Sequence, residues 1–329
     1  FLIAGMNLLT ASVHDYASLS VRHAVLGIGE ASFGVFAPAL LADFFAEDKR
    51  NTVMTIFNVA IPVGAALGYI SGGVVSQHHG WRMAFIVSAI PGIIIALLIW
   101  FFMREPDHVV VSTEHTKADK GAILSLLKNK AYLGAILGYA AITFSLGGIS
   151  AWIPAFLQRI DGYDAAQAGT IMGGITVACG LGGTIVGGII AQKWSHKTEK
   201  ALYYVPAISA GLAVVPSVLT FFGPKSLTLP MLGVAVFLIF LGTGPINAAT
   251  LNAVPANLRA MAMAGQLFTI HVLGDTFSPT IIGTISDHTN LRVGLASTLV
   301  TFALGAVIFF FGARYAPKLK HTVGAEATA

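Results

Sequence analysis

Charged side chains are scarce in this chain of 329 residues: Asp, Glu, Lys and Arg together make up 10% of it. A soluble domain carries roughly 25% charged residues, so this chain has less than half the usual supply for a surface in contact with water. Hydrophobic residues account for 55%, and the mean hydropathy is +0.78. The shortage of charge therefore excludes an ordinary soluble domain and indicates a chain that lies in a lipid bilayer.

Cysteine and the motifs of enzymes are also nearly absent. Cys179 is the one cysteine and lies in an apolar run, so the sequence offers it no disulfide partner. We find no His-Glu-x-x-His zinc motif, no Gly-x-Ser-Gly, no aspartate pair set for catalysis and no Walker-type phosphate loop. We therefore expect no enzymatic activity, no metal and no cofactor, and no use of ATP unless a partner supplies it.

Long apolar runs are what the sequence has in abundance. A hydrocarbon core about 30 Å thick needs a helix of roughly 20 apolar residues, and runs such as Val87–Phe102 lack the alternation of barrel strands. We therefore predict an all-α membrane protein. The ten predicted spans are approximately Phe1–Leu19, Ala24–Phe44, Val53–Val75, Met83–Met103, Tyr132–Leu157, Ala166–Gln192, Ala201–Phe222, Leu227–Ala253, Ala260–Ser286 and Val293–Ala313.

Lysine and arginine are sorted by loop, which predicts the orientation. If the first span runs outward from the cytoplasm, cytoplasmic loops and ends hold fourteen of these residues and the opposite side holds five. An excess of Lys and Arg marks the cytoplasmic side of a membrane protein. The formal charge of +4 therefore reports topology and no nucleic-acid partner, and both ends are predicted to be cytoplasmic.

The longest polar segment predicts the domain organisation. Residues 104–130 have mixed charges and include Pro106, and we interpret them as a cytoplasmic linker that is helical in part. They divide the remainder of an N-terminal bundle of four helices (1–103) from a six-helix C-terminal bundle (131–316), which a cytoplasmic tail (317–329) follows. Transporters are often built from two related halves, so four helices against six imply that two helices are absent at the start.

Three blocks of sequence resemble a known family. They are Gly27-Ile28-Gly29-Glu30-Ala31-Ser32 with the Leu41–Phe45 stretch, Ala60–Gly64 with Leu67–Gly72, and His271–Asp275 with Ser278-Pro279 through Asp287. These blocks, in this order, are similar to the Spinster family of the major facilitator superfamily. The resemblance implies a major facilitator fold of twelve helices, about ten of them present, that works by alternating access. It also implies export of sphingosine phosphate or lysophospholipids with proton coupling.

The second span carries three candidate site residues. Glu30 lies well within an apolar helix, where a charged side chain costs at least about 2.5 kcal/mol unless it has a polar partner or a wet cavity. A carboxyl group removed from water holds its proton more tightly, so Glu30 is a candidate proton carrier or else a structural hydrogen-bonding group. Arg22 and His23 lie about two turns away and suit an anionic substrate, although snorkelling to the interface also explains Arg22. In the resembled family an arginine stands seven residues before the glutamate, where this chain has His23.

The later spans carry the other candidates. His271 and Asp275 are four residues apart, hence on one helical face, and histidine is the side chain whose charge changes near neutral pH. We expect a proton relay or substrate contact there, with a polar clamp between helices as the alternative. Asn247 is expected to offer a hydrogen bond to a substrate head group.

These observations together predict a secondary active transporter of a small or amphipathic organic solute, lysolipid-like or an organic anion, with proton coupling. A non-transporting receptor or scaffold and a lipid scramblase are the alternatives. The expected partners are the lipid bilayer, the solute and protons. We expect a monomer in a bacterial inner membrane.

Overall fold

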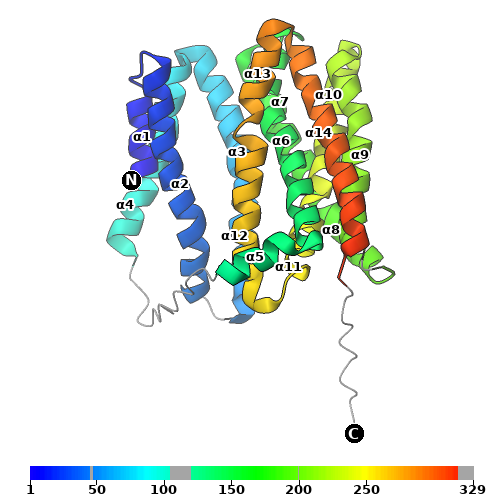
Figure 1. Cartoon of the computed structure of the whole chain (residues 1–329). Coiled ribbons are helices and arrows are strands. Elements are labelled where there is room, and N and C mark those ends of the chain that lie inside the picture. Colours follow the sequence, from blue (N-terminus) through cyan, green and yellow to red (C-terminus); the bar gives the residue numbers. More distant parts are fainter. Residues whose placement is uncertain (45–46, 104–119, 199, 318–329) are drawn as a thin grey trace. The chain divides into compact units, whose positions relative to one another are not determined.

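The computed structural model describes residues 1–44, 47–103, 120–198 and 200–317. All regular elements in these ranges are helical (Figure 1), which confirms the predicted all-α fold. Six helical runs among them are long and apolar enough to cross a membrane. These runs are Trp81–Phe102, Lys130–Arg159, Ala165–Ser195, Ala201–Phe222, Lys225–Asn252 and Leu291–Tyr315.

The chain forms two compact units. The first comprises Phe1–His115 and Leu157–Val177, and the second comprises Thr116–Phe156 and Ala178–Ala329. The predicted boundaries of the two bundles remain predictions.

The first unit is built from five helices. They are α1 (Leu2–Thr10), α2 (Tyr16–Phe44), α3 (Glu47–His79), α4 (Trp81–Phe102) and α7 (Ala165–Ile175). Within this unit α1 packs against α2 and α4, while α3 packs against α4 and α7.

The boundary between the first two predicted spans differs from the structure. The chain leaves α1 after Thr10, and α2 begins at Tyr16 and not at Ala24. The cause is Asp15, whose carboxylate accepts hydrogen bonds from the Ser18 backbone N–H at 2.8 Å and the Ser18 hydroxyl at 2.6 Å. A side chain in this position satisfies N–H groups that the first helical turn leaves free.

Glycine contacts bring α3 and α7 together within the first unit. A Cβ atom on Gly73 would lie 2.6 Å from the Ala165 carbonyl oxygen, and one on Gly169 would lie 3.0 Å from the Gly73 Cα. Close packing along α3 is therefore found at Gly73. It is not found at Gly64 or Gly68, where no described atom lies within 4 Å of an added Cβ.

The second unit contains the remaining helices. They are α5 (Lys120–Lys128), most of α6 (Lys130–Arg159), α8 (Gly182–Ser195), α9 (Ala201–Phe222), α10 (Lys225–Leu241), α11 (Thr243–Asn252), α12 (Arg259–Ile270), α13 (Ser278–His288) and α14 (Leu291–Gly312). Two 3₁₀ turns, η2 (Ala256–Leu258) and η4 (Ala313–Tyr315), and two π-helical turns, η1 (Thr176–Leu181) and η3 (His271–Asp275), complete the described elements.

Small residues also set the close packing of the second unit. A Cβ on Gly134 of α6 would lie 2.8 Å from the Gly312 Cα of α14. A Cβ on Gly187 of α8 would overlap the carbonyl oxygen of Leu241 at the end of α10. Backbones can approach this closely only where side chains are small, as is usual between membrane helices.

Candidate functional site

A π-helical turn interrupts the helical run at residues 259–288 of the second unit. The sequence predicts one continuous span at 260–286, but the run consists of α12, the turn η3 and α13. The Thr276 backbone N–H donates to the His271 carbonyl, five residues back, at 3.1 Å. Single π turns inside α-helices occur frequently at functional sites, and η3 carries both His271 and Asp275.

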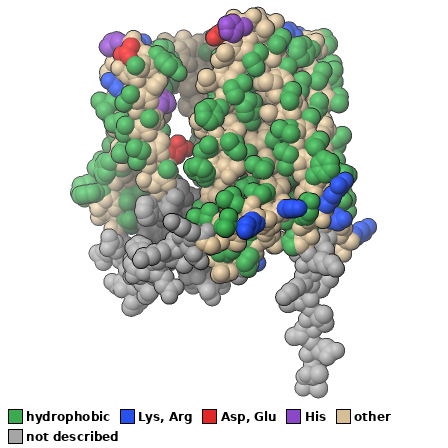
Figure 2. All heavy atoms as spheres, in the orientation of Figure 1, with side chains coloured by type: hydrophobic (Ala, Val, Ile, Leu, Met, Phe, Trp, Pro, Cys, Tyr) green, Lys and Arg blue, Asp and Glu red, His purple; other side chains and the backbone are tan. Residues whose placement is uncertain are grey.

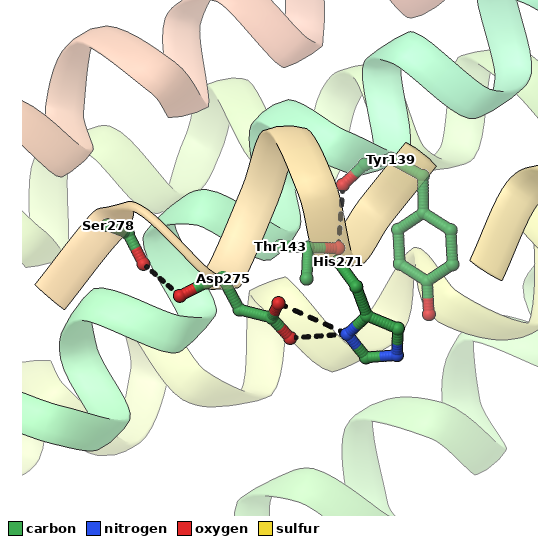
Figure 3. Close-up of polar contacts among 5 residues, drawn as sticks. All are labelled: Tyr139, Thr143, His271, Asp275 and Ser278. Atoms are coloured by element: carbon green, nitrogen blue, oxygen red, sulfur yellow. Dashed lines mark hydrogen bonds and ion pairs between the residues drawn. The ribbon is translucent and has the colours of Figure 1, made fainter. Parts of the chain in front are cut away.

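The two side chains of the turn form a direct polar contact (Figure 3). The His271 Nδ1 lies 3.1 Å from Oδ1 and 3.0 Å from Oδ2 of Asp275. A carboxylate oxygen can only accept a hydrogen bond, so Nδ1 carries the hydrogen and the other ring nitrogen, Nε2, is left to gain or lose a proton. The pair is accessible, with side-chain exposures of 57% for His271 and 34% for Asp275.

Helix α6 supports the turn from one side. A Cβ on Gly147 would lie 2.6 Å from the Asp275 Cβ, and a Cβ on Gly274 would lie 3.0 Å from the Ala140 carbonyl oxygen. The indole N–H of Trp152 donates to the Pro279 carbonyl at 2.8 Å and so fixes the start of α13. The pair therefore stands on a tightly packed backbone while its polar atoms remain accessible.

Two polar residues of α6 lie near the pair. Figure 3 shows the Tyr139 ring on the same side as the His271 imidazole. The Thr143 hydroxyl donates to the Tyr139 carbonyl at 2.8 Å, and the Ser278 hydroxyl donates to the Asp275 carbonyl at 3.4 Å. Tyr139 and Thr143 were not among the predicted site residues, because the sequence alone does not reveal which face of α6 meets η3.

Asn247 belongs to a different polar cluster of the second unit. Its side-chain oxygen accepts a hydrogen bond at 2.7 Å from the amide of Gln266, whose side chain is only 2% exposed. Gln266 also accepts a hydrogen bond from the buried Thr250 hydroxyl. This cluster joins α11 to α12, so Asn247 has a structural partner, and its role toward a substrate stays a prediction. Gln266 was missed, although a lone amide in an apolar run is the signal for it.

Glu30 lies on α2 in the first unit and is exposed. No described residue forms a hydrogen bond or an ion pair with it. The neighbouring Gly29 packs against α1, where an added Cβ would lie 2.8 Å from a Leu2 methyl carbon. Close helix packing thus explains Gly29, whereas the carboxylate itself is accessible to a solute or a proton.

Arg22 and His23 make local contacts at the start of α2. The Arg22 guanidinium donates to the Leu9 carbonyl and, at 3.1 Å, to the Ser12 hydroxyl. The cation therefore caps the C-terminal end of α1, where free carbonyls favour positive charge. The His23 Nδ1 lies 3.2 Å from the Leu19 carbonyl oxygen, and its ring meets Phe85 edge to face at 5.8 Å. Neither residue contacts Glu30 in any described interaction.

No group of three or more His, Cys, Asp or Glu side chains in the described ranges is arranged to hold a metal ion. The described candidate residues include an exposed carboxylate in the first unit and an accessible His–Asp pair in the second.

The fold and its long apolar helices together define a multi-pass helical membrane protein. The chain belongs to the Major Facilitator Superfamily, whose sequence model matches residues 1–264. Spinster proteins are among its curated relatives. It is 32% identical over 309 residues to the "probable sphingolipid transporter spinster homolog 2" of Arabidopsis thaliana, covering 88% of this chain and 63% of that protein. It is 30% identical to the "sphingosine-1-phosphate transporter SPNS2" of Danio rerio, covering 83% and 58% of the two chains.

Solved structures show the same fold. A bacterial homologue of the human lysosomal transporter Spinster, inward-facing and unoccupied, matches with a TM-score of 0.84 at 17% identity, covering 95% of this chain and 81% of that one. A D-xylose–proton symporter matches with a TM-score of 0.71 at 16% identity, covering 96% and 78%. The chain spans less than two thirds of the length of the first curated relatives that it matches.

Proposed function

We propose that the full-length protein containing this chain is a proton-coupled secondary transporter of an amphipathic organic solute. The observation that carries the proposal is the His271–Asp275 contact in a π turn of a helical run. Ionisable side chains within membrane helices are costly and mark transport pathways and proton relays. A pair that is both ionisable and accessible is suited to exchange protons.

The chemistry of the pair supports proton coupling. In the proposal the Nδ1–H group is directed at the Asp275 carboxylate. Protonation of Nε2 then places an imidazolium cation beside the carboxylate anion, so the pair carries no net charge. Loss of that proton leaves one net negative charge at the same place. Glu30 is the second proton-exchanging group in the proposal, because it is accessible and has no described ionic partner.

The solute class follows from two supports. The printed names of the relatives concern sphingolipids and sphingosine 1-phosphate, which combine an apolar chain with a charged head. This chain offers charge-changing groups at His271, Asp275 and Glu30 among predominantly apolar helices. We therefore propose a lysolipid-like molecule, with a small organic anion as the second choice. We further propose that the protein acts as a monomer in a bacterial inner membrane, with both ends of the chain in the cytoplasm.

Uptake into proteoliposomes tests this proposal. Labelled lysophospholipid, sphingosine phosphate and small organic acids are offered to the full-length protein and to the variants His271→Gln and Asp275→Asn. We expect saturable uptake of an amphipathic solute that falls at least about tenfold in both variants, a loss of about 1.4 kcal/mol. His288→Gln and Asp287→Asn are matched controls, since both residues are exposed at the end of α13. Equal loss in controls and site variants, or full uptake in all four, would contradict the proposal.

A further inference from the structure

The short helix α5 lies directly before a helix that is long and apolar enough to span a membrane. It ends at Lys128, and one residue, Asn129, separates it from α6, which begins at Lys130. Asn129 holds this junction: its side-chain oxygen accepts from the Tyr132 N–H at 3.1 Å, and its amide donates to the Ala253 carbonyl at 2.6 Å. Because α6 is long and apolar enough to span a membrane, α5 is fixed beside the point where that span begins.

One side of α5 packs on the protein. Leu126 is 6% exposed and belongs to a buried cluster with four residues of the second unit: Tyr132, Ile136, Val254 and Ala262. Figure 1 shows α5 running across the direction of the neighbouring helices. This side of the helix therefore holds it flat against one end of the second unit.

Another side of α5 is apolar and uncovered. Ile123, Leu124 and Leu127 are 43%, 52% and 57% exposed. Residues three and four apart lie on the same helical face, so these three side chains form one patch beside Leu126. Ser125 lies on the opposite, polar side and is also exposed. A helix with one side on the protein and a second apolar side uncovered has the pattern of a helix that lies in the membrane interface.

Cations follow the patch at the end of α5 and at the start of α6. Lys128 and Lys130 are exposed, and the Lys130 ammonium lies 5.1 Å from the centre of the Tyr315 ring. The Arg314 guanidinium lies 4.7 Å from the centre of the Phe311 ring. Figure 2 shows Lys and Arg side chains along this edge of the second unit. No acidic side chain among the described residues forms an ion pair with these three cations.

We propose that α5, together with Lys128, Lys130 and Arg314, is an anchor that binds the anionic phospholipids of the adjacent leaflet. The three exposed apolar side chains enter the boundary between head groups and acyl chains, and the cations bind lipid phosphates. Cations without an ionic partner among the described residues favour an anionic surface, and their long stems can reach it while lying along apolar surface. The anchor does not depend on which solute is transported.

Position-specific fluorescence tests the anchor. The full-length protein is prepared with Cys179→Ala and a single new cysteine, Leu124→Cys or the matched control Ser125→Cys, each labelled with a polarity-sensitive dye. Nanodiscs contain phosphatidylcholine with or without phosphatidylglycerol. We expect the dye at position 124 to be shifted to the blue and quenched by spin-labelled lipid, more strongly with phosphatidylglycerol. The dye at position 125 should report water in both lipids.

Charge variants complete the test. Lys128→Gln with Lys130→Gln should reduce the preference for phosphatidylglycerol at position 124 by about fivefold for each cation, whereas Lys225→Gln, at the start of α10, should leave it unchanged. Equal water exposure at positions 124 and 125 would overturn the proposal. Shielding at position 124 that is indifferent to phosphatidylglycerol would overturn it as well, as would shielding that appears only when a soluble protein is added.

Discussion

Single polar side chains decide what the helices of this protein can do and how they are held. The carboxylates of Asp275 and Asp15 have different roles. Asp275 lies in a helical run and contacts an ionisable partner, His271, so its surroundings change with proton binding. Asp15 lies between α1 and α2 and caps a helix through Ser18. The first residue serves the proposed chemistry, and the second sets where a helix begins.

The cap at Asp15 predicts a local dependence on pH. Hydrogen bonds from the Ser18 hydroxyl and then the Ser18 N–H hold the pKa of Asp15 below its usual range. Because the folded pKa is lowered, the cap is fully present above the unfolded value and is lost as the pH falls through the folded value, below about 4. We expect Asp15→Ala to speed hydrogen exchange at residues 18–20 at neutral pH. Asp15→Asn should keep protection there, and equal exchange in both variants would contradict the cap.

The buried amide of Gln266 predicts a loss of stability. Gln266→Leu would leave the side chains of Asn247 and Thr250 without their described partner. An unsatisfied buried polar group costs about 1–3 kcal/mol, so we expect the midpoint of thermal unfolding to fall. Gln192→Leu, at an exposed position on α8, is the control and should change it little. An unchanged midpoint in Gln266→Leu would show that the cluster has no structural role.

At the scale of single residues, the sequence predicted the His271–Asp275 contact but not its surroundings. A spacing of four brings the two side chains together in a helical turn, which requires no knowledge of the tertiary fold. The neighbours Tyr139 and Thr143 come from α6, more than a hundred positions earlier in the chain. Their presence depends on how α6 packs on η3, which periodicity in a uniformly apolar helix does not encode. The partners of Arg22, Leu9 and Ser12, were also missed, because they depend on how α2 packs beside the end of α1.

At the scale of elements, glycine contacts determine which helices can meet and where. Gly147 of α6 faces η3, and an added Cβ there would lie 2.6 Å from the Asp275 Cβ and 2.9 Å from the Ser278 hydroxyl oxygen. A separation under 3 Å requires one of the two backbones to move. The position of the candidate proton-exchanging pair therefore depends on a residue that has no chemistry of its own.

Gly147→Ala is expected to disturb the pair without changing either member. Overpacking of this kind costs about 1–3 kcal/mol, so the variant should lower both thermal stability and solute uptake. Gly188→Ala on α8 is the matched control, since no described atom lies within 4 Å of an added Cβ there, and alanine favours a helix interior by roughly 0.5–1 kcal/mol. Stability and uptake equal to the control would contradict the predicted contact between α6 and η3.

The longest helices were predictable from the sequence, whereas the breaks within the helical runs were not. Long apolar runs located α4, α6, α9 and α14 to within a few residues, because hydropathy alone marks such spans. The turn at 11–15 was missed although Ser12, His14 and Asp15 interrupt the apolar run there, and Asp15 caps the start of α2. The π turn η3 was missed because a π turn has the composition of an ordinary helix. Helix α5 lies in the segment predicted to be helical in part.

At the scale of the whole molecule, the chain consists of two compact units that each supply ionisable groups. The first contains Glu30, and the second contains His271 and Asp275. A carrier that works by alternating access binds its solute and coupling ion between two related halves. We propose that proton movement accompanies solute movement in this protein and requires Glu30.

The most direct test is a measurement of internal pH in proteoliposomes that contain the full-length protein. A gradient of lysophospholipid or organic acid is imposed, and a trapped dye follows the internal pH. We predict solute-dependent proton movement that is absent in Glu30→Gln and retained in Asp287→Asn, a carboxylate exposed at a helix end. Solute flux without proton movement in the unmodified protein, or undiminished proton movement in Glu30→Gln, would contradict the account.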